Sequence, residues 1–179
     1  SGAACAWVDV NDTLSPESAV AAGVELKRLL WLRTSAERKQ KITNKPWPRL
    51  EQALKATDLL LQAGGFGAIV LDMSDVLPQH AMSISLGVWY RFRLAAEQAR
   101  TALIFLSQVP CAHSCATLAL RCEPANIRPF SSDGETALFE QQQYTLLRER
   151  NRNEDSVFRQ KKPPMRAAWR AETLWSRVR

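Results

Sequence analysis

The stretch Ala53–Asp72, with the sequence ALKATDLLLQAGGFGAIVLD, places a helix signal, a turn signal and a strand signal one after another. Apolar residues recur every three or four positions in its first part, which predicts an amphipathic helix over residues 48–63. The Gly-Gly pair then ends the helix, because glycine adopts the left-handed backbone at little cost. The apolar run Ala68–Leu71 has the length of a buried strand and is followed directly by Asp72. The stretch therefore predicts one helix–turn–strand unit that carries an aspartate at its end.

The rest of the chain continues this alternation of helix and strand signals. Ser15 and Pro16 begin a helix that Gly23 ends, and a longer helix is predicted over residues 84–100. Residues 144–149 fit a strand or a helix. Further strands are predicted over residues 5–10, 29–32, 102–107 and 117–122. This pattern is typical of the α/β class, so we expect a mostly parallel sheet with helices on both faces and an antiparallel extension near the C-terminus.

Length and composition place the chain among globular proteins. It has 179 residues, of which 46% are hydrophobic and 23% charged, enough for one domain with a proper core. No apolar run reaches the roughly 18 residues of a membrane helix, so no membrane contact is expected. The N-terminus shows no export signal. The four cysteines lack the spacing of a disulfide framework, which favours reduced thiols in a cytoplasmic protein.

The positive charge of the chain is concentrated at its C-terminal end. Residues 1–147 contain 14 basic and 14 acidic residues, whereas residues 148–179 contain 10 basic and 4 acidic ones. We therefore expect a neutral core over residues 1–147 and a basic segment over residues 148–179. A basic segment favours an acidic partner, either nucleic acid or an acidic protein surface.

The basic segment also contains tryptophans, and this combination has two interpretations. Arginine and aromatic side chains dominate binding hot spots, which favours a docking helix or a DNA-contacting arm. Alternatively, a terminal helix buries its tryptophans on the domain and leaves its arginines in solvent. Residues 165–175 have helical spacing in either case. The candidate partner- or DNA-binding residues are Arg148, Arg150, Arg152, Arg159, Lys161, Lys162, Arg166, Trp169, Arg170 and Trp175.

Other chemistries receive little support from the sequence. Cys111, His113 and Cys115 lie close together, but structural zinc needs four ligands in paired clusters, so a loop with buried thiols is favoured and no metal is expected. A serine hydrolase is disfavoured because the chain has no G-x-S-x-G turn and only two histidines. For Asp72, a carboxylate that is hydrogen-bonded by nearby backbone is favoured over a Mg²⁺ ligand.

Three segments of the chain, taken in order, resemble the RecA recombinase family and more specifically its ImuA branch. The first is residues 5–30, CAWVDVNDTLSPESAVAAGVELKRLL, which resembles the family run C-A-φ-φ-D-A-E-x-A-L-D-P and the residues after it. The second is the opening stretch 53–72, which resembles the helix, glycine turn and Walker B strand. The third is residues 102–108, ALIFLSQ, which resembles the strand ending in the nucleotide-sensing glutamine. The resemblance covers roughly residues 4–123 and implies a RecA-like sheet.

The departures from the family pattern concern the nucleotide site. No G-x-x-x-x-G-K-[ST] phosphate loop occurs in the sequence, and the family pattern would place it before Ser1. Asn11 stands where the family has its catalytic glutamate, and an amide cannot accept a proton from water at neutral pH. Asp72 and Gln108 match the metal-directed aspartate and the sensor glutamine. We therefore expect a degenerate site at Asn11, Asp72 and Gln108, with no catalytic residue and no cofactor.

The phosphate-loop strand also bears on the expected sheet. In RecA-like cores this strand lies between those that match residues 102–107 and 117–122. We expect that another segment, from this chain or from a second copy, fills the gap, or that the two strands pair with each other. The loops after Asp72 and Gln108 contain no Lys or Arg, which disfavours DNA binding of the RecA filament type.

The resemblance implies a non-catalytic accessory protein of SOS-induced translesion synthesis, part of a mutasome. Its expected partners are an ImuB-like inactive Y-family polymerase subunit and an error-prone replicative-type polymerase, bound through residues 148–179. The alternative is a DNA-dependent ATPase of the RecA class whose phosphate loop lies outside this chain. A SulA-type cell-division inhibitor is a third reading. The sequence leaves open whether the tail binds DNA directly and whether the chain forms a homo-oligomer.

Overall fold

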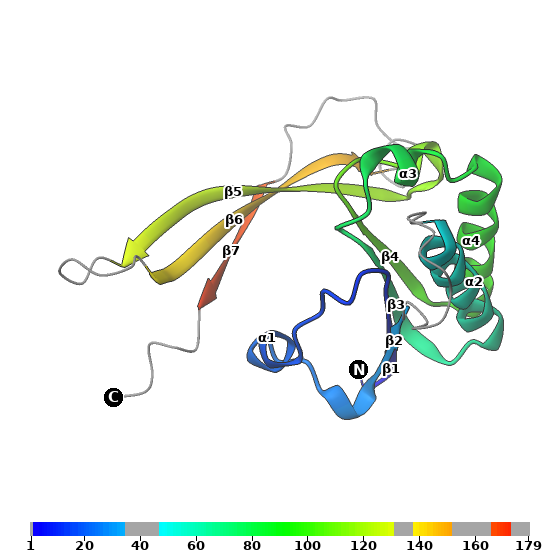
Figure 1. Cartoon of the computed structure of the whole chain (residues 1–179), viewed down its shortest axis with the longest axis horizontal. Coiled ribbons are helices and arrows are strands. Elements are labelled where there is room, and N and C mark those ends of the chain that lie inside the picture. Colours follow the sequence, from blue (N-terminus) through cyan, green and yellow to red (C-terminus); the bar gives the residue numbers. More distant parts are fainter. Residues whose placement is uncertain (1, 35–46, 131–137, 152–165, 173–179) are drawn as a thin grey trace, which may run out of the picture. The chain divides into compact units, whose positions relative to one another are not determined.

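The computed structural model describes residues 2–34, 47–130, 138–151 and 166–172. The chain divides into two compact units, Ser1–Cys115 and Ala116–Arg179 (Figure 1). The boundary expected from the charge distribution, between residues 147 and 148, falls within a strand of the second unit. The distribution of charge indicates which segments face solvent or a partner. Where a compact unit begins depends instead on which backbone segments pair with each other.

The first unit is built on a parallel sheet of four strands. The strands are β1 (Ala4–Asp9), β2 (Leu29–Arg33), β3 (Phe66–Met73) and β4 (Ala102–Ser107). Their order in the sheet is β2-β1-β3-β4, and each neighbouring pair is parallel. The predicted α/β class and the four strand positions are confirmed.

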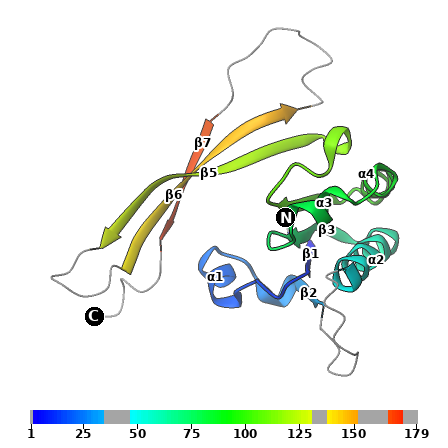
Figure 2. The ribbon, with the colours of Figure 1, turned by 45° about the horizontal axis from the view of Figure 1, so that its top comes forward.

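Two long helices cover one face of this sheet. They are α2 (Trp47–Ala63) and α4 (Leu86–Ala99), which lie on the same side of the strands in two views (Figures 1 and 2). The unit also contains shorter helical segments: α1 (Pro16–Ala21), η1 (Leu26–Arg28), α3 (Pro78–Met82) and η2 (His113–Cys115). None of the described helices is long and apolar enough to cross a membrane.

The direction of the crossovers explains which face is covered. Strand–helix–strand crossovers are almost always right-handed, so crossovers that run in opposite directions along a sheet place their helices on opposite faces. The steps from β2 to β3 and from β3 to β4 run in one direction and carry α2 and α4. The step from β1 to β2 runs the other way, and its helix α1 contains no buried residue. The expected helices on both faces are thus realised as one full layer and one short exposed helix.

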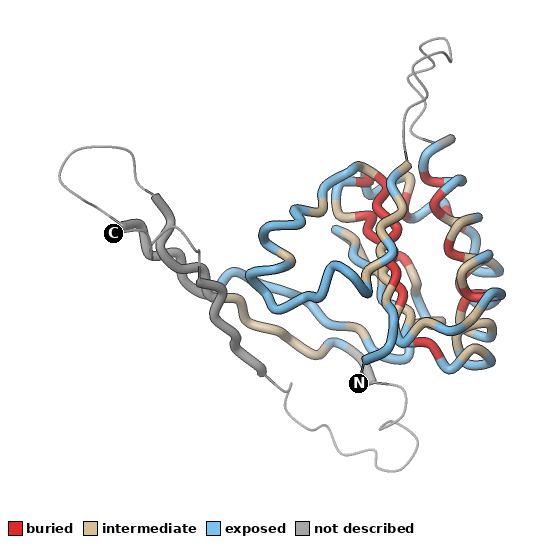
Figure 3. Tube along the Cα trace, turned by 90° about the horizontal axis from the view of Figure 1, so that it is seen from below, coloured by how far each residue is buried: buried red, intermediate tan, exposed pale blue. Residues whose placement is uncertain are grey.

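The hydrophobic core lies between the sheet and the two long helices. The strands contribute buried side chains at alternate positions, Ala6 and Val8 in β1 and Ile69 and Leu71 in β3. The helices contribute buried residues at helical spacing: Leu50, Ala53, Thr57, Leu61, Trp89 and Phe92. Figure 3 shows the buried residues gathered in the central strands and on the helix sides that face them.

The predicted helix ends follow the expected chemistry. The side chain of Ser15 accepts a hydrogen bond from the backbone N–H of Ser18 and caps α1. Gly64, which follows α2, has φ of +66°, a conformation that a side chain would strain. The helix over residues 84–100 is α4, and Arg100 ends it with φ of +53°.

The second unit is an antiparallel sheet, so the antiparallel strands predicted near the C-terminus are confirmed, but they form a sheet of their own. Its strands are β5 (Leu118–Phe130), β6 (Leu138–Asn151) and β7 (Arg166–Glu172), in the order β5-β6-β7. Residues 144–149 are therefore strand. The predicted helix over residues 165–175 is wrong where the structure describes it, because residues 166–172 pair with β6, and Trp169 is the register partner of Tyr144. Pairing with a neighbouring strand outweighed the weak helical spacing.

Of the two arrangements expected for the strands at residues 102–107 and 117–122, direct pairing with each other is contradicted. Strand β5 pairs with β6 and not with β4, so these two strands do not close on each other. Within the described residues, no segment pairs with the outer edge of β4, which bonds to β3 alone.

Candidate functional site

The most chemically distinctive place in the first unit is the carboxyl end of β1 and β3. In open parallel sheets, ligands bind where the strand order reverses, and in the order β2-β1-β3-β4 that point lies between β1 and β3. Asp9 ends β1, and its register partner in β3 is Asp72. Both aspartates are buried, so two carboxylates meet at the switch point of the sheet.

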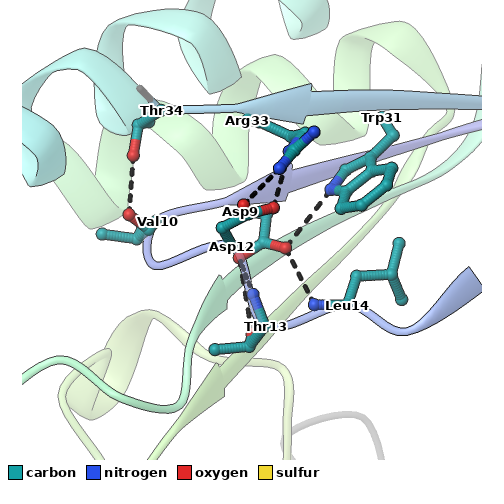
Figure 4. Close-up of polar contacts among 8 residues, drawn as sticks. All are labelled: Asp9, Val10, Asp12, Thr13, Leu14, Trp31, Arg33 and Thr34. Carbon is teal, nitrogen blue, oxygen red and sulfur yellow. Dashed lines mark hydrogen bonds and ion pairs between the residues drawn. The ribbon is translucent and has the colours of Figure 1, made fainter. Parts of the chain in front are cut away.

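Asp9 is held by donors from its own loop and from β2 (Figure 4). Its Oδ1 accepts hydrogen bonds from the N–H of Thr13 at 3.0 Å and from the Thr13 hydroxyl at 3.4 Å. Its Oδ2 accepts from the N–H of Leu14 at 2.9 Å and from the indole Nε1 of Trp31 at 3.2 Å. An ionised carboxylate has about four lone-pair positions. Three of those on Asp9 accept from N–H donors, and the single hydroxyl proton of Thr13 lies within reach of both Asp9 and Asp72.

Asp72 is held in the same manner by the residues around it. Its Oδ1 accepts from both the N–H and the hydroxyl of Ser74, at 3.0 and 2.7 Å. Its Oδ2 lies 3.3 Å from the hydroxyl of Thr13, which thus stands between the two aspartates. Asp72 is hydrogen-bonded by the neighbouring backbone, as the favoured interpretation of the sequence requires. The two carboxylates are joined by one threonine.

An ion pair closes the outer side of this arrangement. Asp12 has φ of +62° and pairs with Arg33, whose Nε lies 2.6 Å from Oδ1 of Asp12. The Arg33 guanidinium also lies over the Trp31 ring, 4.8 Å from its centroid. The Thr34 hydroxyl donates to the carbonyl of Val10 at 2.6 Å. The loop after β1 is therefore fastened to β2 at several points (Figure 4).

The electrostatic state of Asp9 follows from these contacts. Burial raises the pKa of Asp9, but the hydrogen bonds from Leu14, Thr13 and Trp31 stabilise the carboxylate and together outweigh burial. The pKa of Asp9 is therefore lowered from its ordinary value. The carboxylate is negative at neutral pH and is held by neutral donors.

The sequence-predicted site residues lie at the same edge of the sheet. Asn11 is half-buried in the loop after β1, two residues beyond Asp9. Gln108 follows β4, is exposed, and donates from Nε2 to the carbonyl of Ser74 at 2.8 Å. Ser74 therefore links Gln108 to Asp72. The topology brings Asn11, Asp72 and Gln108 to one edge because parallel strands end on the same side.

The predicted binding residues of the tail are only partly described. Arg148 and Arg150 belong to β6, and Arg166, Trp169 and Arg170 belong to β7. The remaining predicted residues lie outside the described residues: Arg152, Arg159, Lys161, Lys162 and Trp175. Near the start of the same sheet, Arg121 of β5 forms an ion pair with Glu149 of β6.

Sequence reasoning missed the residues that hold the carboxylates. Thr13, Trp31 and Ser74 donate to Asp9 or Asp72, and none of them was singled out. Thr13 and Ser74 carried a usable signal, because a hydroxyl residue shortly after a strand-ending aspartate commonly donates back to it. Trp31 lies on a different strand, so only the parallel pairing of β1 with β2 brings its indole to Asp9.

Comparison of the chain with protein-family models and with curated proteins finds no match to either.

Proposed function

We propose that this chain is a non-catalytic, RecA-like accessory protein that binds polymerase-type partners in translesion synthesis. The observation that carries this proposal is the engagement of the switch-point carboxylates by the chain's own donors. Asp9 accepts from Thr13, Leu14 and Trp31, and a metal ion or a reacting water would have to displace them. A carboxylate that is engaged in this way supports the loop and leaves little capacity for catalysis.

The arrangement of the three resembling segments supports the RecA-like part of the proposal. They form three strands in a row, β1, β3 and β4, all parallel. Asp9 and Asp72 are register partners. The side chain of Gln108 donates a hydrogen bond to the backbone carbonyl of Ser74, two residues after Asp72. The resemblance implies a nucleotide at this edge. In this chain, the carboxylates at the same edge accept hydrogen bonds from the chain's own donors.

The basic C-terminal segment supports binding as the activity. Residues 148–179 contain 10 of the 24 basic residues of the chain. Arginine is the preferred residue for planar recognition of carboxylate and phosphate groups. In the proposed function, this segment docks on an acidic surface of an ImuB-like inactive Y-family polymerase subunit or of an error-prone replicative-type polymerase.

The test captures the chain on a surface and measures how tightly each of these two partners binds to it. The native chain is compared with charge-reversal variants. The triple variant Arg159→Glu, Lys161→Glu, Lys162→Glu is expected to weaken binding at least about tenfold, since each rim charge contributes modestly and the three act together. The matched control is Lys27→Glu, Arg49→Glu, Lys55→Glu, which makes the same charge change in the first unit. Docking through the tail is contradicted if both variants weaken binding equally, or if neither variant weakens it.

DNA is the competing ligand of the tail, and salt dependence separates it from protein. Fluorescence anisotropy is measured on the full chain and on a chain that ends at Asn151, which removes β7 and the residues around it. Contacts to phosphate give a steep loss of affinity with salt that the truncation abolishes. Absence of DNA binding at low salt, together with partner binding, assigns the tail to protein docking.

A DNA-dependent ATPase is the second candidate function, and the position of Asp9 and Asp72 at the switch point favours it. In this reading the phosphate loop lies outside the chain. ATP turnover with and without single-stranded DNA tests it, and Asn11→Glu serves as the diagnostic variant because it restores a group able to accept a proton. DNA-stimulated turnover that rises with Asn11→Glu would replace the accessory role with catalysis.

A further inference from the structure

Hydrogen bonds join the residue after β4 to the carboxyl end of β3. Gln108 donates from Nε2 to the carbonyl of Ser74 at 2.8 Å. Ser74 in turn donates from its N–H and from its hydroxyl to Oδ1 of Asp72, at 3.0 and 2.7 Å. Gln108 is exposed, so its amide is within reach of solvent. An exposed side chain therefore holds the loop that supplies Asp72 with two of its donors.

The same series of hydrogen bonds continues from β3 to β1 and β2. Oδ2 of Asp72 lies 3.3 Å from the Thr13 hydroxyl, and Oδ1 of Asp9 lies 3.4 Å from the same hydroxyl. Asp9 also accepts from the indole N–H of Trp31 in β2 at 3.2 Å (Figure 4). Because β2 and β4 are the outer strands of the four, the series spans the whole carboxyl end of this sheet.

The Thr13 hydroxyl is the link in this series that two acceptors share. A hydroxyl has a single proton to donate, and both acceptors here are carboxylates. The proton goes either to Asp9 or to Asp72, at nearly equal distances. The carboxylate that does not receive it keeps only its other donors, and an acceptor that loses a donor is destabilised. The balance between the two arrangements therefore depends on how well Ser74 serves Asp72.

Thr13 belongs to the loop after β1, residues 10–14, which we call the strap. Thr13 also donates its backbone N–H to Asp9 at 3.0 Å, so hydroxyl and backbone are held at the same carboxylate. Asp12 has φ of +62°, a conformation that a residue other than glycine keeps only when its surroundings hold it. The strap is thus fixed by its contacts, and a movement of Thr13 toward Asp72 shifts the strap as a whole.

We propose that the strap is a conformational switch that Gln108 controls through the Thr13 proton. While Gln108 holds Ser74, the two donors of Ser74 serve Asp72. The proton of Thr13 then goes to Asp9. A bound molecule whose oxygen accepts from the Gln108 amide releases Ser74, and Asp72 then takes the Thr13 proton. The strap moves from β1 toward β3. This inference goes beyond the proposed partner binding and does not depend on it.

Nuclear magnetic resonance of the full chain tests the switch at Trp31, whose indole signal is identified by its absence in Trp31→Phe. Gln108→Ala is expected to shift this indole N–H resonance, because the donors around Asp9 rearrange. It is also expected to accelerate amide hydrogen exchange at Thr13 at least about threefold. The matched control is Gln98→Ala, at an exposed position of α4, which should change neither signal. Unchanged exchange of the α2 amides verifies that the effect is local.

Variants of Thr13 test whether the effect passes through the shared hydroxyl. Thr13→Ser retains the hydroxyl, so Gln108→Ala is expected to shift the Trp31 resonance in this background as well. Thr13→Val and Thr13→Ala lack the hydroxyl, and in either background Gln108→Ala should leave the Trp31 resonance unchanged. Two results would overturn the proposal. One is an effect of Gln108→Ala that ends at Asp72 in the native chain, and the other is a Trp31 shift that persists without the hydroxyl.

Discussion

The two faces of the parallel sheet are made from the same strands, but among the described residues of the first unit the long helices cover only one of them. On the covered face, Val8, Ile69 and Leu71 are buried beneath α2 and α4. On the other face, Trp7 and Val70 are half-buried and Ile104 is exposed. Parallel sheets are usually buried on both faces, and their strands are accordingly apolar on both sides. The difference shows that strand composition prepares both faces for burial, while the connections decide which of them is covered.

The carboxylate network belongs to the open face. Asp9 lies two residues after Trp7, and Asp72 lies two residues after Val70, so each aspartate is on the same side of the sheet as the open-face residue before it. In the part of the first unit that the structure describes, no long helix lies on that side, and the loop between β1 and α1 comes back to it instead. We infer that the covered face carries most of the folding free energy, and the open face carries the contacts that shape the site.

The largest expected difference between the faces is in stability. Leu71→Ala on the covered face is expected to destabilise the chain by about 2–5 kcal/mol, because it leaves a cavity in the core. Leu106→Ala makes the same chemical change on the open face, where the leucine is 36% exposed, and is expected to cost less than about 1 kcal/mol. Urea unfolding measures both values. Equal costs would show that something covers the open face in solution.

A smaller effect is expected from Asp9, and it depends on pH. Asp9→Asn removes a carboxylate that accepts several hydrogen bonds, at a cost of about 1.5–3 kcal/mol near neutral pH. Because the pKa of Asp9 is lowered in the folded chain, its carboxylate stabilises the fold above the unfolded pKa of about 3.9. That stabilisation is lost as the pH falls through the folded pKa.

The measurement is the free energy of unfolding from pH 7 downward, for the native chain and for Asp9→Asn. The difference between the two should be largest near neutral pH and should shrink below about pH 4. Asp75→Asn, at an exposed position, controls for the loss of one negative charge. A difference that stays constant over the whole pH range would mean that the network does not favour the ionised form of Asp9.

The smallest of these effects is expected from Thr13, whose hydroxyl lies between the two aspartates. Thr13→Val keeps the shape and the backbone N–H but removes the hydroxyl that lies within 3.4 Å of both carboxylates. The expected cost is about 1 kcal/mol, measured by urea unfolding. In a double-mutant cycle with Asp72→Asn, a coupling near zero would show that Thr13 does not link the two strands.

Much of the fold could be predicted because its signals are local. The helix of α2, the glycines that end it and the strand that leads to Asp72 are all specified by residues within a few positions of one another. The helical spacing after Pro164 was a weak local signal, and pairing of Arg166–Glu172 with β6 outweighed it. The exposure of Ile104 and Leu106 on β4 was not predictable, since it depends on which elements cover that face of the sheet.

The residues of the candidate site were likewise only partly predictable from the sequence. Asp72 was identifiable because it ends an apolar run, and Asn11 and Gln108 because they match positions in a known family pattern. The donors that engage the carboxylates were not identified. Thr13 reaches Asp72 from the loop after β1 and Trp31 reaches Asp9 from β2, and the sequence separations of 59 and 22 residues contain no signal for these contacts.

The sequence by itself determined the class of the fold, the order of its elements and the concentration of basic charge near the C-terminus. These depend on periodicity, turn residues and composition, which act over a few residues. Only the tertiary structure decided that Asp9 and Asp72 lie side by side, that their oxygens accept hydrogen bonds from the chain itself, and that β4, within the described ranges, pairs with β3 alone. The physical reason is that hydrogen-bond partners and burial depend on strand order and crossover direction, which bring together residues far apart in the chain.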